Sequence, residues 1–258
     1  MAKTKISWSE RVWNPITGCS KISQGCKNCY AERMAKRLAG RNGYPAAPDQ
    51  FKVTLHPEKL EDPLHWKKPS MVFVDSMSDL FHKDVPDEFI YRVFKAMSRA
   101  PWHIFQVLTK RAERMAQIVP KIRSMLPDRL EHIWLGVSIE DQPTADLREP
   151  FLLKTPAAVR FISYEPALRY VNLRLWNSIY QNGEQTYKAD LLHWVIMGCE
   201  SGPGARPMEE EWARGMREQC RAAGVSFFYK QAMIDGKLVK LPLLDGKQWK
   251  EFPNEPRI

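Results

Sequence analysis

The sequence predicts an α/β fold of parallel strands, a partial or complete (β/α) barrel, that forms one domain over residues 1–258. Short apolar runs recur about every 30 residues, and most of the gaps between them have a helical pattern. Repeated strand–helix units of this length have right-handed crossovers, so they either close into a barrel or wind into an open sheet. A chain of 258 residues, 44% of them hydrophobic, is long enough for such a domain.

The apolar runs have the composition of strands that are buried on both faces. Each is rich in Val, Ile and Phe and lacks polar alternation, as is typical of a parallel sheet covered by helices. A further strand is expected near residues 11–16, in an aromatic-rich segment. The predicted strands are Met71–Asp75, His103–Leu108, His132–Val137, Val159–Ser163, His193–Met197 and Val225–Tyr229.

Helical periodicity occupies most of the gaps. Phe89, Val93 and Met97 fall on one face of the clearest candidate, and Pro86 suits its first turn. The gap 165–192 has no helical period, so we expect an irregular insertion there. The predicted helices are 30–39, 86–100, 111–125, 144–153 and 208–223, with Gly40 and Gly224 as stop signals for the first and last.

The chain divides into three segments. Residues 1–69 hold the N-terminal segment and a cysteine-rich loop, and within them 41–69 reads as a long surface connection rich in Pro, Gly and charge. Residues 70–230 carry the strand–helix repeats. Residues 231–258 form a tail with two Asp-Gly turns, so a small hairpin-like tail is expected to cover one end of the barrel.

The composition excludes some classes of protein. No run of 18 apolar residues exists and the N-terminus has no apolar signal core, so we expect a cytoplasmic protein without a membrane span. The net charge of +9 favours an anionic partner, such as a nucleic acid or a nucleotide. Positive charge is concentrated around the cysteine loop, at Lys21, Lys27, Arg33, Lys36, Arg37 and Arg41.

Three of the five cysteines, Cys19, Cys26 and Cys29, fall within eleven residues with the spacing C-x6-C-x2-C. An odd and clustered set argues against a disulfide framework and for metal binding. Three thiolates without a nearby fourth ligand leave one iron of a [4Fe–4S] cluster open to a small molecule. A structural zinc site, which prefers four closed ligands, is the alternative, and the residues alone leave both open.

Polar side chains follow every predicted strand, at the edge where barrels and open α/β sheets bind ligands. We therefore expect one shared site there. Glu165, Glu200, Arg206 and Lys230 are predicted to hold a substrate, although each could equally pair with another charge. Cys220 falls on the apolar face of helix 208–223 and is expected in the core.

A cysteine loop after the first strand of a (β/α) barrel resembles the radical S-adenosylmethionine (SAM) superfamily, whose usual spacing is C-x3-C-x2-C. The run 25–31 is similar to the loop of the spore-photoproduct-lyase-like branch, and the pairs 78–79 and 109–110 match its Ser-Asp and Thr-Lys pairs. More closely, nearly the whole chain resembles a phage-associated three-cysteine-motif family of uncharacterised proteins. The runs that carry this resemblance are 13–19, 75–82, 106–111 and 200–207.

The resemblance implies a [4Fe–4S] cluster on Cys19, Cys26 and Cys29, with SAM bound beside it. It places Asp79 on the SAM ammonium group, Lys110 on the carboxylate and Ser138 near the ribose. It implies reductive cleavage of SAM to a 5′-deoxyadenosyl radical, fed by an external electron donor, to modify or repair a nucleic acid or nucleotide. The cofactor-binding residues predicted in this way are Tyr30, Ser76, Ser78, Asp79, Lys110, Ser138 and Glu140.

The sequence departs from the superfamily pattern at three further positions. Asn28 replaces an aromatic residue before the last cysteine of the loop, and Tyr30 follows one place later. Met77 replaces the hydrogen-donating cysteine of spore photoproduct lyases, so that repair reaction is not expected. Cys199 stands where the three-cysteine family more often has glycine. The alternatives are a zinc- or cluster-stabilised nucleic-acid-binding protein without catalysis, and a barrel that keeps a cluster only for structure.

Overall fold

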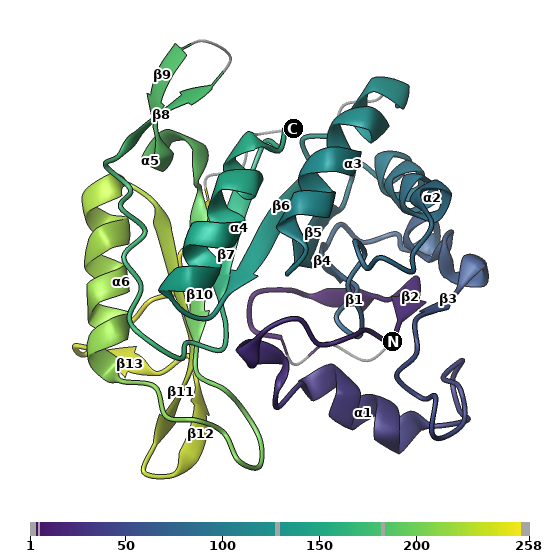
Figure 1. Ribbon diagram of the computed structural model, residues 1–258, viewed down its shortest axis with the longest axis horizontal. Helices are drawn as coiled ribbons and strands as arrows, with labels where there is room; N and C mark the ends of the chain where they lie inside the picture. The colour runs from purple at the N-terminus through teal and green to yellow at the C-terminus, as the bar shows by residue number, and fades with distance from the viewer. Residues whose placement is uncertain (1–3, 5, 127–129, 182–183, 254–258) are drawn as a thin grey trace.

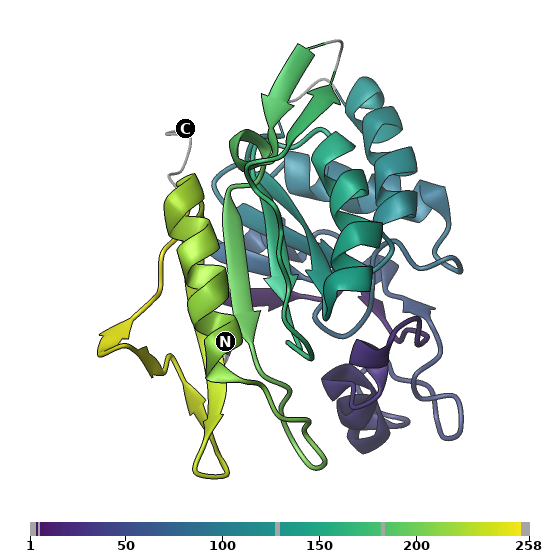
Figure 2. The ribbon, with the colours of Figure 1, turned by 60° about the vertical axis from the view of Figure 1, so that its left-hand side comes forward.

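The computed structural model describes residues 4, 6–126, 130–181 and 184–253, and for 179–181 the backbone alone. The chain forms a mixed α/β fold around an eight-stranded sheet that curls into a half-barrel (Figures 1 and 2). Seven neighbouring strands are parallel, and β12 is antiparallel to β11. In sheet order the strands are β1 (Arg11–Trp13), β4 (Met71–Val74), β5 (Ile104–Thr109), β6 (Ile133–Ile139), β7 (Arg160–Tyr164), β10 (Trp194–Gly198), β11 (Ser226–Ile234) and β12 (Lys237–Lys240).

The predicted class and the predicted parallel strands are thus confirmed, in the form of a partial barrel. The order of the parallel strands in the sheet follows their order in the chain, because each crossover moves the chain one strand further in the same direction. β1 and β12 form the two edges of the sheet.

Helices cover the outer face of the sheet, and the main core lies between the two layers. Asp141 caps α4, where its carboxylate accepts from Thr144 N at 3.0 Å, and Gly224 ends α6 with a φ of +67°. In the described part of the chain, four helices cover this face, and each of them begins and ends within two residues of its predicted bounds. They are α2 (Asp87–Ser98), α3 (Ala112–Met125), α4 (Gln142–Lys154) and α6 (Glu210–Ala223).

The inner face of the half-barrel is filled near the N-terminal ends of its strands. Trp134, Phe161, Trp194 and Phe228 form a second buried cluster there with Trp8. Because side chains alternate along a strand, the positions two and four residues further on face the same interior. After Trp134 on β6 those positions are Gly136 and Ser138, and after Phe161 on β7 they are Ser163 and Glu165, so an apolar floor gives way to a more polar upper level.

Three irregular segments differ from expectation. The predicted strand near 11–16 is divided into β1 and β2 (Ile16–Thr17), and β2 pairs with β3 (Thr54–Leu55) inside the 41–69 connection. That connection also holds two short 3₁₀ helices, η2 (Pro57–Lys59) and η3 (Asp62–His65), and it buries His56 and Leu60, so it is not only a surface segment. The insertion 165–192 contains a hairpin, β8 (Ser178–Gln181) with β9 (Glu184–Tyr187), and the short helix α5 (Lys188–Leu191).

The tail forms two hairpins at the predicted Asp-Gly turns. β11 continues to Ile234, and β12 returns along it after the turn at 235–236. A second, smaller hairpin joins β13 (Leu243–Leu244) to β14 (Lys247–Gln248). The first hairpin extends the edge of the sheet (Figure 2). Residues 254–258 lie outside the described part of the chain. In that part, no helix has the length and apolar character needed to cross a membrane.

Candidate functional site

A cavity of about 300 Å³ opens at the C-terminal ends of the parallel strands, against the cysteine loop (residues 18–29). Residues in or just after six of the seven parallel strands line it together with the cysteine loop that follows β1 and β2, so residues from the predicted strand ends gather around one cavity. Glu140 and Arg206 do not line it and contact the cysteine loop instead. The other predicted site residues all line it: Cys19, Cys26, Cys29, Tyr30, Ser76, Ser78, Asp79, Lys110, Ser138, Glu165, Glu200 and Lys230.

The cysteine loop is anchored where it leaves the sheet. Gly18 N donates to Met77 O at 3.0 Å, and Cys19 N donates to Phe51 O at 3.0 Å. Gly18 has a φ of +83°, and a Cβ there would lie 2.1 Å from the carbonyl oxygen of Lys52. Only glycine fits this crossing, which turns the loop over the ends of the strands.

The three thiols of the loop are free and partly exposed. Burial, and after it the charge of Asp79, raises the pKa of Cys19 to about 11. Burial also acts to raise the pKa of Cys26, but backbone hydrogen bonds of the loop and the charge of Lys110 outweigh it and lower that pKa. Cys26 is therefore the more readily deprotonated of these two thiols, and the thiolate is the form that would bind a metal.

The donor chemistry of this wall fits a cluster bound by three thiolates. Cys19 and Cys26 share the wall with Cys29, and the cations Arg111 and Lys110 stand near the first two sulfurs as counter-charges. Among the residues that the structure describes, no three His, Cys, Asp or Glu side chains converge on a point where one metal ion could be held. The cluster and the zinc site both stay predictions.

Asp79, which was predicted to bind an ammonium group, is the centre of a buried hydrogen-bond network. Its Oδ1 accepts from Thr109 Oγ1 at 2.6 Å and from Phe81 N at 3.0 Å. Its Oδ2 accepts from Lys110 N at 3.1 Å and from Arg111 Nη1 at 2.8 Å. A carboxylate has about four lone-pair sites, and all are in use. Asp79 therefore orients the residues after β5.

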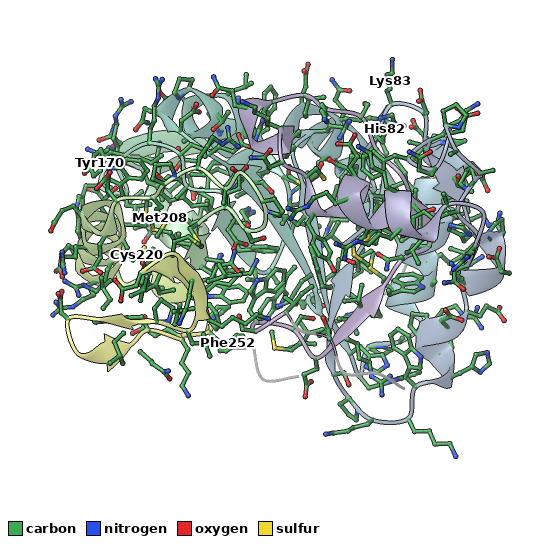
Figure 3. All side chains as sticks on the ribbon, turned by 90° about the horizontal axis from the view of Figure 1, so that it is seen from below. His82, Lys83, Tyr170, Met208, Cys220 and Phe252 are labelled. Carbon is green, nitrogen blue, oxygen red and sulfur yellow. The ribbon has the colours of Figure 1, made fainter. Side chains whose placement is uncertain are left out.

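Arg111 and His82 both hold Ser20 of the cysteine loop. Arg111 Nη2 donates to Ser20 O at 3.1 Å, and its Nη1 lies 3.5 Å from Cys19 Sγ. His82 Nε2 lies 2.7 Å from Ser20 Oγ, while its Nδ1 accepts from Asp84 N at 3.1 Å. The ring proton is therefore on Nε2, so His82 donates to the serine and is not its base. Figure 3 shows His82 on the side of the molecule that carries the N-terminal ribbon, and Cys220, a residue of α6, on the opposite side.

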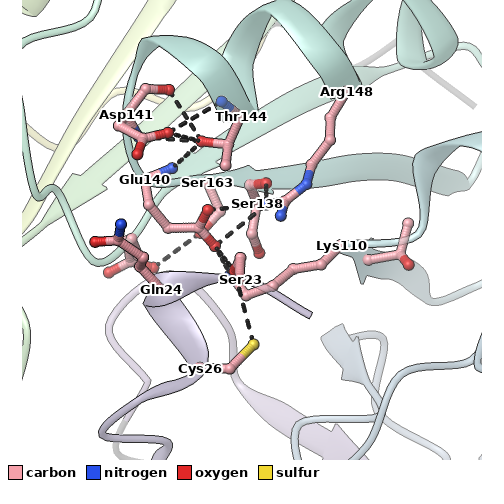
Figure 4. Close-up of polar contacts among 12 residues, drawn as sticks. Ser23, Gln24, Cys26, Lys110, Ser138, Glu140, Asp141, Thr144, Arg148 and Ser163 are labelled. Atoms are coloured by element: carbon pink, nitrogen blue, oxygen red, sulfur yellow. Dashed lines mark hydrogen bonds and ion pairs between the residues drawn. The ribbon is translucent and has the colours of Figure 1, made fainter. Parts of the chain in front are cut away.

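Glu140 is completely buried and ties the cysteine loop to β6 (Figure 4). Its carboxylate accepts from Ser23 Oγ at 2.9 Å and forms ion pairs with Lys110 at 2.6 Å and Arg148 at 3.1 Å. Burial acts to raise the pKa of Glu140, but the two cations outweigh it and hold that pKa below its ordinary value. A Cβ on Gly25 would lie 2.5 Å from the Glu140 side chain, so the loop packs tightly on the carboxylate.

Glu200 holds the loop from the end of β10, two strands away from β6 in the sheet. Its Oε2 accepts from Asn28 Nδ2 at 2.8 Å and from Arg206 Nε at 2.9 Å. Asn28 also donates to Gly204 O at 2.9 Å, and Arg206 donates to Gln24 O at 3.0 Å. Glu200 and Arg206, predicted as substrate contacts, thus pair with each other and hold the loop at Gln24 and Asn28, on either side of Cys26. An aromatic side chain at position 28 could not make the two amide hydrogen bonds that Asn28 donates to Glu200 and Gly204.

A second wall of the cavity comes from β7, β10 and β11. Lys230 Nζ lies 2.8 Å from Glu165 Oε1, and Ser163 Oγ donates to Glu165 Oε2 at 3.1 Å. Cys199 also lines this wall, and burial, followed by the charge of Glu165, raises its pKa to about 11. The side chains of Lys230 and Glu165 are partly exposed, whereas Cys199 and Ser163 are buried.

Comparison with protein-family models gives a match over residues 3–253 to the description "Protein of unknown function (DUF5131)". The chain belongs to the DUF5131 family. Comparison with curated proteins and with solved structures gives no match. The functional argument for this DUF5131 protein therefore rests on its site.

Sequence reasoning missed Asp75, which lines the same cavity of the DUF5131 fold. Its Oδ1 accepts from Ile16 N at 3.1 Å, whereas its Oδ2 has no partner within the described part of the chain. Burial raises the pKa of Asp75 well above its ordinary range. Asp75 follows Phe73 by two positions at the end of β4, and an alternation pattern applied to that strand would have found it.

Proposed function

We propose that this protein is an iron–sulfur enzyme of the radical SAM type, which cleaves SAM reductively to modify or repair a substrate. The observation that carries the proposal is the presence of three free cysteines and Lys110 around one cavity at the C-terminal face of a parallel half-barrel. When bound there, a [4Fe–4S] cluster and SAM supply the 5′-deoxyadenosyl radical, and an external donor provides the electron.

Lys110 is the residue best suited to hold the SAM carboxylate. Its ammonium group has three donors, and its pair with Glu140 uses one of them. Its side chain is 19% exposed, so the remaining donors can reach the cavity. Asp79 supports this role of Lys110 indirectly. Its Oδ2 accepts from Lys110 N and so fixes the backbone directly after β5. Ser76, Ser78 and Ser138 line the same cavity and complete the proposed SAM site, whereas Tyr30, which was predicted to join them, lines the cavity from an exposed position.

The second wall is the proposed substrate side. Glu165 and Lys230 form an ion pair that offers both an acceptor and a donor, and Ser163 adds a hydroxyl group. A neutral pair of this kind suits a polar substrate such as a nucleobase, which presents both donors and acceptors on its edge. A nucleic acid or a nucleotide is therefore the proposed class of substrate.

Anaerobic reconstitution with iron and sulfide tests the proposal. We expect about four irons per chain, a brown protein, and conversion of SAM to 5′-deoxyadenosine on reduction. Single Cys→Ala variants at 19, 26 and 29 should lose the cluster and the cleavage. Cys220→Ala serves as the matched control that keeps both, because Cys220 is buried in the core and lies outside the loop.

The outcome also separates the alternatives. Tightly bound zinc without colour would support the nucleic-acid-binding protein without catalysis. A stable iron–sulfur cluster with no SAM cleavage under any reductant would leave the cluster a structural role and remove the proposed activity.

A further inference from the structure

The positive charge of this protein is distributed unevenly. Between Cys19 and Lys52 there are seven Lys and Arg residues and two carboxylates, a net charge of +5 out of +9 for the whole chain. We call five of these side chains the basic surface, since all five are exposed and lie on α1 (Tyr30–Leu38) or beside it. The basic surface consists of Lys27, Lys36, Arg37, Arg41 and Lys52.

Most of this charge is not neutralised within the protein. Lys36 lies 3.9 Å from Glu32, which also pairs with Lys21 at 2.9 Å. The other four members of the basic surface have no ion pair in the part of the chain that the structure describes. A helix dipole accounts for cations in the last turn of α1, at Lys36 and Arg37, but not for the three that lie outside the helix.

The shape of α1 restricts what the basic surface can bind. Its inward side chains Ala31 and Ala35 are buried in a small cluster with Tyr44 and Met77. The remaining apolar side chains of the helix pack against the same cluster, so the outer face presents charge without exposed apolar groups other than Tyr30. A helix that inserts into a lipid surface needs an apolar face, which α1 does not offer.

The basic surface adjoins the cysteine-lined cavity through two aromatic residues. Tyr30 begins α1, is 58% exposed and lines the cavity, and Phe51 lines the cavity one residue before Lys52. Rings placed between a cationic surface and a cavity of about 300 Å³ resemble the parts of a single-strand binding site, in which cations follow the backbone and rings stack on bases.

We propose that the basic surface binds the phosphodiester backbone of a nucleic acid single strand and that Tyr30 stacks on a base at the mouth of the cavity. A nucleic acid single strand is thus the substrate class for the proposed radical chemistry. The binding proposal rests on the proposed function only for the chemical step. The strand crosses α1 and the turn after it, and the base at the cavity faces the wall that carries Glu165 and Lys230.

Fluorescence anisotropy with labelled single-stranded DNA and RNA of about 20 nucleotides tests this binding over a salt series. The test variant is Lys27→Ala with Arg37→Ala and Arg41→Ala. A phosphate contact on a single strand contributes about 0.7 to the salt slope, which is about 4-fold in affinity at 0.15 M salt. The triple variant should therefore bind about 50-fold more weakly, with a slope smaller by about 2.

The matched control removes three exposed cations from the helices on the outer face of the sheet: Lys95→Ala, Lys121→Ala and Lys154→Ala. It lowers the net charge equally and should change affinity by less than about 2-fold. Tyr30→Ala should weaken binding roughly 5- to 150-fold, while Tyr30→Phe keeps the ring and the affinity. Circular dichroism checks that each variant is folded.

Three results would overturn the proposal: no salt-dependent binding by the unmodified protein, an equal loss in the control triple, or equally tight binding of polyglutamate or anionic vesicles. The binding assay contains no SAM and no reductant. Its failure would leave the SAM-cleavage test standing, and a failure of SAM cleavage would leave the measured strand binding intact.

Discussion

Among the buried glutamates that form ion pairs in this protein, Glu140 and Glu149 have environments that predict different effects of the same substitution. Glu140 pairs with two cations, Lys110 and Arg148, which hold its pKa below the ordinary value. Glu149 pairs with one cation, Lys188, at 2.7 Å, and its Oε1 has no partner in the described part of the chain. Burial dominates at Glu149 and raises its pKa.

The substitution Glu140→Gln should be strongly destabilising. It leaves Lys110 and Arg148 without a counter-charge, and breaking a buried pair in this way costs about 3–5 kcal/mol. For a chain of this size that corresponds to a fall in Tm of roughly 6–20 °C. Glu149→Gln keeps an acceptor for Lys188 and removes a charge whose burial is unfavourable, so its effect should stay within about 1 kcal/mol.

The dependence on pH has opposite signs at the two positions. Because the folded pKa of Glu140 is depressed, its stabilising contribution is complete above the unfolded pKa of about 4.3 and is lost as the pH falls through the folded value. Because the folded pKa of Glu149 is raised, the unmodified protein loses stability as the pH rises from about 4.3 through the folded value. The variant Glu149→Gln should not show this pH-dependent loss of stability, because glutamine does not titrate.

Urea unfolding followed by tryptophan fluorescence at about pH 3.5, 5 and 7 measures both effects, because the change at Glu140 lies below about pH 4.3 and the change at Glu149 lies above it; m-values are compared to check that the transitions remain equivalent. Equal losses of stability in the two variants, or a loss below about 1 kcal/mol for Glu140→Gln, would refute the argument that the pairing of Glu140 outweighs its burial.

Three further predictions concern other positions around the loop and the core. Gly25→Ala should destabilise the protein by about 1–3 kcal/mol in urea unfolding, because its Cβ would lie 2.5 Å from Glu140; a neutral result would show that the loop moves aside easily. Asp75→Asn should become more stable relative to the unmodified protein as the pH rises from about 4, since the raised pKa of Asp75 costs stability in that range; a pH-independent difference would contradict it. Cys220→Ser should lower stability by about 1–3 kcal/mol, because a hydroxyl enters an apolar core position, and reconstituted iron content would be measured to confirm that it is unchanged.

The parallel sheet could be predicted because its signal is local. All seven residues of β6 are buried, and a strand covered on both faces shows this as an unbroken apolar run. The open edge could not be predicted in the same way. β11 continues beyond the predicted end at Tyr229 and pairs with β12 after the turn at Asp235, so the hairpin occupies the sheet edge where a closing strand would pair. Closure depends on contacts between distant segments, which periodicity does not reveal.

The position of the site could also be predicted, but the partners of its charges could not. Strand ends of a parallel sheet meet at one edge, so the rule placed Lys110, Glu165 and Lys230 in one cavity. Glu140 and Glu200 were expected to face ligands, yet they accept from Ser23 and Asn28, which are 117 and 172 residues away in sequence. A buried carboxylate needs donors, and only the fold determines which ones are near.

These long-range contacts share one consequence for the cysteine loop. Asp79 after β4, Glu140 after β6 and Glu200 after β10 each hold it through a different strand of the sheet, by way of Arg111, Ser23 and Asn28. The positions of the three sulfurs thus depend on the curvature of the half-barrel as well as on the loop itself. The first spacing between the cysteines can therefore be wide without leaving the sulfurs unrestrained: the sheet, through three carboxylates, supplies the restraint that a shorter loop would supply by its length.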